Sequence, residues 1–480
     1  MKGVSPYYLI AFAFNAVLQV FCPGILLNSA ARDLTDVLIR GSSFTVEGND
    51  TTIAAREFAP VFAGAFSQAV TQEFPHASVA PAFSYRYNPA LTVFERSTGV
   101  PGPLFSERAL TLGKGQFNVG VAYSFIDFTD FNGTDLDHIQ SPALLTDVLD
   151  NEAVDRGDGF FLAPASLSLI RTGIDLKAHL VVPAMRYGIT ENWEVSLSIP
   201  VVHSSLRVRN DARQIVDVDP SSARFLFSRD TQGQPVFIGY RDANGLPITD
   251  LSQLRLIKSQ RPATHLAQAS GSATGVGDLT LRSKYRFWET EEGGAALGLS
   301  LQLPSGEERD FHGTGDTHLS TFVYLSQVFR DLVEPHLNLG VDFNADDVDR
   351  SAFLWAVGVT VRIGDRLGLV MDFLGRSEFG RLPVRIPPEG RFDSGFLTNR
   401  APETCTAQQP CAISAKTLAN PISFAFFPER VRRNNIADLS FGVRYIIGTS
   451  GSLFFGALVP LNDDGLRADF IPSGGIEFTF

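Results

Sequence analysis

The last eight residues, Ser473-Gly474-Gly475-Ile476-Glu477-Phe478-Thr479-Phe480, carry the pattern that decides the fold. Ile476, Phe478 and Phe480 alternate with small or polar residues. Successive side chains of a β-strand point to opposite faces, so this alternation predicts a strand with one apolar face. A helix would need apolar residues three and four positions apart. The chain is therefore expected to end in a half-buried strand.

The same alternation recurs many times upstream of this ending. Its clearest examples are Phe117–Phe125, Trp193–Val201 and Phe353–Ile363, where apolar residues occupy every second position. A strand that crosses a membrane at a tilt needs roughly ten residues. We expect the apolar row of each strand to face lipid and the other row to face a lumen. The twelve expected strands are residues 117–129, 168–188, 192–209, 274–288, 294–304, 317–329, 333–344, 351–363, 366–376, 435–447, 452–462 and 468–480.

The connections between these strands differ at the two ends of the expected barrel. Short turns are expected near Thr190, Glu291, Asp331, Gly364 and Thr449. The other connections are 130–167, 210–273, 305–316, 345–350, 377–434 and 463–467. Short periplasmic turns and longer outer loops are typical of outer-membrane proteins, so the sequence predicts an all-β, transmembrane, antiparallel up-and-down barrel. A soluble β-sandwich or propeller is the alternative, and its strands would be shorter.

One expected strand, 168–188, is less regular than the others. Its apolar and polar residues alternate less regularly, and Pro183 lacks the N–H group that would donate a hydrogen bond to the neighbouring strand. Its bounds are therefore the least certain of the twelve.

Residues 1–31 have the features of a secretory signal peptide. Lys2 supplies a short positive region, Tyr8–Phe21 is apolar, and Ser29–Ala31 offers small residues for cleavage. A membrane anchor is the alternative, but the apolar stretch is short for a span and polar residues interrupt it.

Removal of the signal peptide would take away Cys22 and leave two cysteines, Cys405 and Cys411. Exported proteins fold in an oxidising compartment, where disulfides persist. We expect these two residues to form a disulfide that closes a small loop within the long connection 377–434.

Residues 32–115 lack the strand alternation and are expected to form a separate N-terminal segment. Apolar residues between Phe58 and Phe74 recur at helical spacing, and Pro75 ends the predicted helix. A segment of this size before the first strand predicts a plug inside the lumen or a cap on the periplasmic end. A loosely ordered periplasmic tail is the alternative.

The C-terminal strand also carries a recognition pattern. Ser473, Gly475, Phe478 and Phe480 stand at the positions of a motif with a polar residue, a glycine, an aromatic residue and a terminal phenylalanine. This ending resembles the signal that the barrel-assembly machinery reads in outer-membrane proteins. The resemblance implies residence in the cell outer membrane, with that machinery, outer-membrane lipid and lipopolysaccharide as partners.

Three further stretches are distinctive. They are Gly275–Leu281 running into Lys284–Phe287, then Leu301–Glu307, and Val459–Gly465. Together they resemble outer-membrane transporter families found beside aromatic-compound degradation genes, such as the MetA-pathway phenol-degradation family, and related barrel families. The resemblance covers residues 115–480 and implies passage of small hydrophobic or aromatic compounds. An N-terminal plug is also similar to that of long-chain fatty acid channels, which have more strands than are counted here.

Strand parity places a set of charged residues inside the expected barrel. Cations close to carboxylates across a narrow lumen can set the selectivity of a pore. The alternative is a salt-bridge network that fills the barrel without selecting solutes. The inward-facing charged residues are Arg282, Lys284, Arg286, Asp342, Arg362, Asp438 and Arg444.

Other site chemistries have weaker support. His203 and Ser205 share a face near the outer edge, as in some lipid-cleaving barrels, but no third residue is placed to orient a base. His312 and His318 flank a short loop that could hold a metal, although such pairs usually do not. Asp130–Asp137 has its glycine at the wrong position for a calcium loop. We expect no catalytic residues, no metal and no cofactor.

The net charge of −12 argues against nucleic acid as a partner. The sequence therefore predicts an outer-membrane channel for passive diffusion of small, hydrophobic or aromatic solutes. One alternative is a structural or adhesive barrel that acts through residues 210–273 and 377–434. A second is a lipid-modifying enzyme.

Overall fold

The computed structural model describes residues 33–42, 69–70, 84–88, 93–96, 98–146, 154–155, 160–163, 165–218, 224–229, 235–242, 244–248, 255–258, 264–290, 292–380, 411–412 and 434–480. The predicted signal peptide at 1–31 lies outside these residues. Cys405 also lies outside them, so the disulfide with Cys411 stays a prediction.

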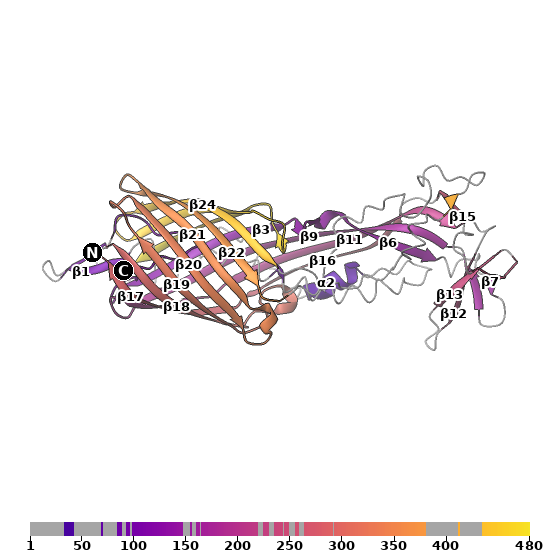
Figure 1. Cartoon of the computed structure of the whole chain (residues 1–480), viewed down its shortest axis with the longest axis horizontal. Coiled ribbons are helices and arrows are strands. Elements are labelled where there is room, and N and C mark those ends of the chain that lie inside the picture. The colour runs from indigo at the N-terminus through magenta and orange to yellow at the C-terminus, as the bar shows by residue number, and fades with distance from the viewer. Residues whose placement is uncertain are drawn as a thin grey trace, which may run out of the picture.

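Twelve antiparallel strands close a barrel within the described residues, as predicted (Figure 1). The last strand pairs with the first, with Phe478 opposite Val119. Two of the twelve are broken and carry two labels each. The wall strands are β3 (Phe117–Phe128), β9 (Ala165–Gly188), β10 (Trp193–Ser198) with β11 (Val201–Val218), β16 (Thr264–Val276) with β17 (Leu279–Thr290), β18 (Gly293–Leu303), β19 (His318–Gln327), β20 (Val333–Asn344), β21 (Ala352–Ile363), β22 (Leu367–Glu378), β24 (Asn435–Ile447), β25 (Gly451–Pro460) and β27 (Ile471–Thr479).

The two breaks lie beside each other in the wall. β10 ends before Ile199 and Pro200, and β16 ends before Gly277. Gly277 N donates to Pro200 O at 2.8 Å, and Ile199 N donates to Pro183 O at 3.0 Å, so the wall stays hydrogen-bonded across the breaks. Strand β9 is continuous through Pro183, which faces Val121 in β3. The strand with the least regular alternation is thus the longest unbroken strand of the barrel.

The two ends of the barrel are named here by their connections. The turn end holds the short turns after β9, β17, β19, β21 and β24, at the predicted positions. The loop end holds the long connections. Both the C-terminal strand and the start of β3 reach the turn end, where Phe480 N donates to Phe117 O at 2.7 Å (Figure 1). No helix in the described ranges is long and apolar enough to cross a membrane.

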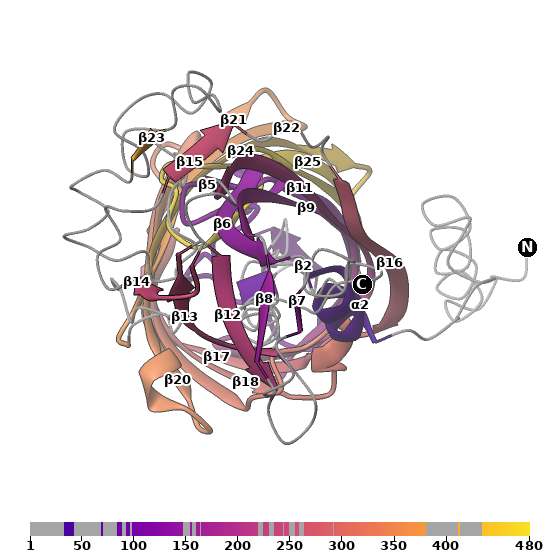
Figure 2. The same ribbon diagram turned by 90° about the vertical axis from the view of Figure 1, so that its right-hand side faces the viewer.

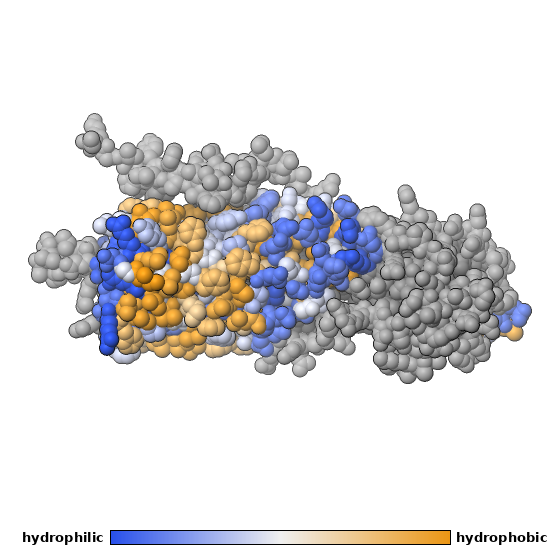
Figure 3. All heavy atoms as spheres, turned by 90° about the horizontal axis from the view of Figure 1, so that it is seen from above, coloured by the Kyte–Doolittle hydropathy of each residue, from blue (hydrophilic) through white to orange (hydrophobic). Residues whose placement is uncertain are grey.

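An apolar belt surrounds the barrel wall. Leu281, Leu297, Val341 and Phe373 are among many large hydrophobic side chains that are exposed on the outer face. In Figure 3 the belt is the orange band, with hydrophilic residues on both sides of it. Exposed aromatic residues gather on its turn-end side, and they include Tyr187, Trp193, Tyr285, Trp288 and Tyr445. An apolar band with an aromatic girdle is the surface of a barrel that spans the outer membrane, as predicted.

Three wall strands continue beyond the belt at the loop end, which corrects the predicted bounds of two connections (Figure 1). β9 and β11 stay paired as far as Ser166 and Asp217, and β16 begins at Thr264. Here Arg207, Arg209 and Asp211 stand on the outer face of β11. Apolar alternation marks only the part of a strand that meets lipid, so it could not reveal this polar extension.

The long connections contain further strands, where the sequence predicted only loops. β6 (Ile139–Thr146) pairs with β9, and β15 (Arg255–Lys258) pairs with β11 and with β23 (Cys411–Ala412). Five strands from two connections form a separate sheet in the order β14-β13-β12-β8-β7. They are β7 (Val154–Asp155), β8 (Phe160–Ala163), β12 (Arg224–Arg229), β13 (Pro235–Arg241) and β14 (Pro247–Ile248). A third sheet joins β26 (Leu466–Arg467), β4 (Asp130–Phe131) and β5 (Thr134–Asp135), and short helical turns are η1 (Leu136–His138), η3 (Glu308–Asp310) and η4 (Val348–Arg350).

Helix α2 (Leu34–Ser42) lies on the inner side of β11 and β16 at the loop end (Figure 2). Leu34, Val37 and Leu38 are buried against inward-facing residues of the wall such as Val208. A Cβ at Gly41 would lie 2.4 Å from Val208 Cβ, so the helix packs directly on the strand. The sequence reasoning missed this helix, although its apolar residues recur at spacings of three and four.

Only Ala69 and Val70 of the predicted helix at 58–74 are described. Both are helical and buried in the same apolar cluster as α2. Residues 84–88 and 93–96 of the N-terminal segment lie at the turn end. There β1 (Tyr85–Asn88) and β2 (Val93–Arg96) form a hairpin, and Tyr85 N donates to Leu112 O at 3.0 Å.

Candidate functional site

Residues 98–113, called here the plug, occupy the turn-end half of the lumen without forming a helix or strand. Their backbone groups bond to side chains of the wall instead. Glu107 N donates to Asn338 Oδ1 at 2.8 Å, and Asn338 Nδ2 donates to Glu107 O at 2.7 Å. Ala109 N donates to Ser326 Oγ at 3.0 Å. Buried backbone groups need partners, and here the polar inner wall supplies them.

Charged side chains of the wall bind the plug backbone in the same way. Lys284 Nζ donates to Leu110 O at 3.0 Å, and Leu112 N donates to Glu194 Oε2 at 2.6 Å. Arg444 donates to Pro103 O at 2.8 Å and pairs with Glu477 at 2.6 Å. Lys284, Glu194 and Arg444 therefore bind the plug backbone from the inner wall at this end.

A buried group of five charges, called here the turn-end charge cluster, surrounds one plug carboxylate. It consists of Glu107 from the plug and Arg186, Glu194, Arg282 and Lys284 from the wall. Glu107 lies 3.0 Å from Arg186, 3.3 Å from Lys284 and 3.8 Å from Arg282. Glu194 lies 2.6 Å from Arg186 and 2.9 Å from Lys284. Burial alone would raise the pKa of Glu107, but the charges of Arg186 and Lys284 hold this pKa below its usual range.

Two more contacts anchor the plug. Arg108 and Glu334 form an ion pair of 2.8 Å in which both side chains are 0% exposed. Ser106 Oγ donates to Asp372 Oδ1 at 2.8 Å, and the same oxygen lies 2.5 Å from His336 Nε2. A buried charge without a partner is costly, so Glu334 depends on the plug being in place, whereas Asp372 keeps His336 as a partner within the wall.

The loop-end half of the lumen is closed by apolar packing. Leu34 and Leu38 of α2 share one buried cluster with Phe131, Phe311 and Leu466. The loop after β18 holds the helix, since Leu34 N donates to Asp310 Oδ1 at 3.2 Å and Thr35 Oγ1 donates to Arg309 O at 2.9 Å. This apolar cluster is called here the loop-end core.

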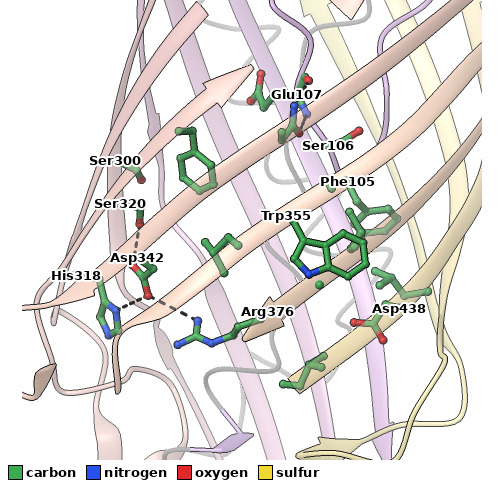
Figure 4. Close-up of a pocket in the computed structure, with 18 of the residues that line it drawn as sticks. Phe105, Ser106, Glu107, Ser300, His318, Ser320, Asp342, Trp355, Arg376 and Asp438 are labelled. Carbon is green, nitrogen blue, oxygen red and sulfur yellow. Dashed lines mark hydrogen bonds and ion pairs between the residues drawn. The ribbon is translucent and has the colours of Figure 1, made fainter. Parts of the chain in front are cut away.

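A cavity of about 240 Å³ lies between the plug and the loop-end core. Phe105 and Glu107 of the plug line one side, and Leu466 and Ala468 line the side next to the loop-end core. On its wall His318 Nδ1 lies 2.9 Å from Asp342 Oδ2 (Figure 4). The lining of the cavity contains both apolar and charged side chains. Its other lining residues include Thr280, Arg282, Ser300, Gln302, Ser320, Phe322, Tyr324, Trp355, Arg376, Asp438 and Arg467.

The seven charged residues singled out in the sequence divide into two groups. Arg282, Asp342 and Asp438 line the cavity. Asp438 pairs with Arg467 of β26, and Asp342 also accepts from Ser320 Oγ at 2.8 Å.

The other four, Lys284, Arg286, Arg362 and Arg444, are not among the residues that line the cavity. Lys284 and Arg444 bind the plug. Arg286 donates to Asn192 Oδ1 at 2.8 Å, and Arg362 pairs with Asp331, whose carboxylate accepts from Gly99 N. A role of all seven in solute selection stays a prediction.

Sequence reasoning did not single out Glu107, Arg186, Glu194, Glu334 and Arg376 as site residues, although alternation placed Glu194 in the lumen-facing row. Arg186 and Glu194 alternate with the outward residues Tyr187 and Trp193, so strand parity could have found them. Glu107 lies outside any strand, and no periodic pattern marks it.

His203 and His312, which the sequence suggested for lipid cleavage and metal binding, both contact nearby residues of the wall. His203 faces outward at the loop-end edge of the belt, where its Nδ1 lies 2.7 Å from Thr274 Oγ1 and its ring centroid lies 5.9 Å from that of His179. His312 packs over Gly275, where a Cβ would lie 2.5 Å from its Nδ1. Among the described residues, no group of three or more His, Cys, Asp or Glu could hold a metal ion.

Two of the distinctive sequence stretches meet at the loop end of the wall. Asp278 accepts from Gly306 N at 3.0 Å and from Thr314 N at 2.8 Å. Ser305 Oγ donates to Gly277 O at 2.9 Å. The residues that carry the resemblance therefore brace the loop after β18, which in turn holds α2.

Comparison with known proteins gives one family and several distant structures. The model of the family described as "Putative MetA-pathway of phenol degradation" matches residues 236–375. Among solved structures, an outer membrane channel from Pseudomonas putida F1 is similar with 11% identity and a TM-score of 0.40, covering 78% of this chain and 98% of that chain. A FadL homologue from Pseudomonas aeruginosa has 9% identity and a TM-score of 0.29, covering 84% and 96%. Among curated proteins, no sequence matches.

A further solved structure, the monoaromatic hydrocarbon channel CymD, has 11% identity and a TM-score of 0.25, covering 77% of this chain and 89% of that chain. The family match covers both stretches that meet at Asp278. Over residues 236–375, the predicted resemblance to the phenol-degradation family is therefore confirmed.

Proposed function

We propose that this protein is an outer-membrane channel through which small amphipathic or aromatic solutes diffuse passively. The observation that carries the proposal is the cavity of about 240 Å³ inside a closed barrel with an apolar belt. A cavity in the lumen, between a plug and an apolar core, is a place where a solute can pause during passage. The match to a phenol-degradation family agrees with a small aromatic solute.

Conductance through the purified protein in planar lipid bilayers tests this function. The double substitution E334Q/N338A removes the partner of Arg108 and both bonds from Asn338 to Glu107. We expect the variant to conduct at least about tenfold more often than the wild type, because the plug loses the contacts that hold it. Asp365→Asn, at a 94% exposed side chain in a turn, is the matched control and should leave conductance unchanged. Absence of conductance from both the wild type and the double variant would contradict a channel.

We also propose that residues 1–31 direct export and that the barrel-assembly machinery reads the C-terminal strand. Phe478 and Phe480 are exposed on the outer face, while Ser473 is buried inside, 2.7 Å from Ser124 Oγ. The outward aromatic side chains are therefore accessible to an assembly partner. Deletion of Phe480 should lower the amount of protein in the outer-membrane fraction.

One observation favours a second function. The polar extension of β9, β11 and β16 and the sheet β14-β13-β12-β8-β7 project from the loop end (Figure 1). A structural or adhesive protein would act through this projection. Deletion of the sheet with unchanged conductance but lost surface binding would support that function. A lipid-modifying activity has less support, because His203 contacts Thr274, and unchanged lipid hydrolysis in His203→Ala would exclude its role.

A further inference from the structure

Arg282 is the member of the turn-end charge cluster with the weakest compensation. Three cations of the cluster, Arg186, Arg282 and Lys284, face two carboxylates. Arg186 and Lys284 each approach both carboxylates within 3.3 Å, whereas Arg282 lies 3.8 Å from Glu107 alone. Its Nε is buried without a hydrogen-bond partner, and 29% of its side chain is exposed. The cluster therefore carries one positive charge in excess, and that charge borders the cavity.

The other charged side chains that line the cavity have further or closer partners. Asp342 lies 2.9 Å from His318 and also contacts Arg376, and Asp438 pairs with Arg467. Arg376 lies 3.7 Å from the carboxylates of both Asp342 and Glu378. Among the cations that line the described cavity, Arg282 therefore has the weakest carboxylate contact, a single one at 3.8 Å.

An apolar surface lies next to this guanidinium. Arg282 faces Ser300 across the β17–β18 pair, and one step nearer the turn end Gly298 faces Phe322. A side chain at Gly298 would meet the ring of Tyr324, since its Cβ would lie 2.5 Å from Tyr324 Cε2. Phe322 and Tyr324 are stacked with ring centroids 5.6 Å apart, and both line the cavity.

The plug supplies an aromatic ring from another direction. Phe105 lines the same cavity, beside Ser106 and Glu107, and lies toward Trp355 in the view of Figure 4. A buried apolar cavity of about 150 Å³ is large enough to bind benzene. The cavity of about 240 Å³ can therefore hold one aromatic ring together with a small head group.

We propose that this cavity binds a small amphipathic carboxylate, with the carboxylate on Arg282 and the apolar body among Phe105, Phe322 and Tyr324. A guanidinium donates two parallel hydrogen bonds to a carboxylate, which fits an anion better than a neutral hydroxyl. This inference deepens the proposed channel function, because it names the class of solute that pauses in the lumen.

Isothermal titration of the purified full chain with sodium benzoate and with benzyl alcohol tests the inference. The two probes share a ring and differ in charge. Arg282→Gln should weaken benzoate binding about tenfold and leave benzyl alcohol binding unchanged, because only the carboxylate uses the charge. Arg286→Gln, on the same inner face but hydrogen-bonded to Asn192 away from the cavity, is the matched control. Arg282→Lys should retain part of the benzoate affinity, and heat-dependent migration on a denaturing gel checks the folding of each variant.

No benzoate binding by the wild type, or an equal loss for both probes in Arg282→Gln, would overturn the inference. If Arg282→Gln does not fold, a selective loss of benzoate affinity in Arg282→Lys supports the inference, and an unchanged affinity overturns it. The channel function fails separately. Arg282-dependent benzoate binding without any conductance would contradict the channel but not the site, and conductance without such binding would contradict only the site.

Discussion

The two halves of the lumen are closed by different chemistry. At the turn end an irregular plug is held by charged wall residues such as Lys284, Glu334 and Arg444. At the loop end helix α2 is held by an apolar cluster that includes Leu38 and Val208. The helix pairs most of its backbone groups internally and docks mainly through apolar contacts, whereas the backbone of the plug is hydrogen-bonded by side chains of the wall. The wall around the plug is accordingly rich in charge, whereas the part of the wall that α2 covers presents apolar residues such as Leu206 and Val208.

The same difference predicts how each closure fails. An ion pair buried from water is costly when one partner is lost, because the other charge stays without compensation. Truncation of a buried apolar side chain costs only the free energy of burying the removed atoms and the free energy of the cavity left behind. The plug should therefore open in response to single charge substitutions, and α2 should respond to large-to-small apolar substitutions.

The largest effect is expected from Glu334→Ala. The variant leaves Arg108 buried without its partner, so plug docking should weaken by about 3–5 kcal/mol. Hydrogen exchange of residues 98–113 should accelerate, while exchange of the wall strands stays slow. The double substitution R108L/E334L is the control, since replacing both charges with apolar residues should restore slow exchange. Slow exchange of the plug in Glu334→Ala would show that the ion pair does not hold it.

A smaller effect is expected from Leu38→Ala in α2. Loss of this buried side chain should cost about 2–3 kcal/mol of helix docking, the lower part of the usual range, because α2 lies near the mouth of the barrel. Protease cleavage within residues 33–42 should then increase, and plug exchange should not change. Arg40→Ala, at an exposed ion pair with Asp36, is the control and should have little effect. Faster exchange of the plug in Leu38→Ala would mean that the two closures are coupled.

The smallest effect near neutral pH is expected from titration of Glu107. The pKa of Glu107 in the docked plug is lower than its usual value of 4.5. The charged carboxylate therefore stabilises plug docking at pH values above 4.5. This stabilisation is lost as the pH falls through the lower pKa that Glu107 has in the docked plug. The hydrogen-exchange rate of the plug amides, corrected for the intrinsic pH dependence of amide exchange, should be constant from about pH 8 to about pH 5. It should rise only in stronger acid. Glu107→Gln should abolish the acid-dependent step. A transition near neutral pH would assign the titration to another group.

The wall of the barrel could be predicted from the sequence to within a few residues, and the site only in part. Alternation placed all twelve strands and the inward orientation of Lys284 and Arg444. It missed α2, whose turns are few, and it underestimated β11 and β16, whose loop-end parts carry polar residues on the outer face. Glu107 was missed because the plug has no regular structure and hence no period to detect.

The sequence by itself determined which residues face hydrocarbon, because lipid contact imposes a two-residue period on every strand that crosses it. Only the tertiary structure decided which charges meet inside. Lys284 and Glu107 are 177 positions apart, and Arg444 and Pro103 are 341 apart. Closure of the barrel brings such residues together, and no local pattern records a contact that the closed ring creates. The cavity beside Arg282 exists for that reason alone: the plug and α2 each fill one half of the lumen and leave the space between them.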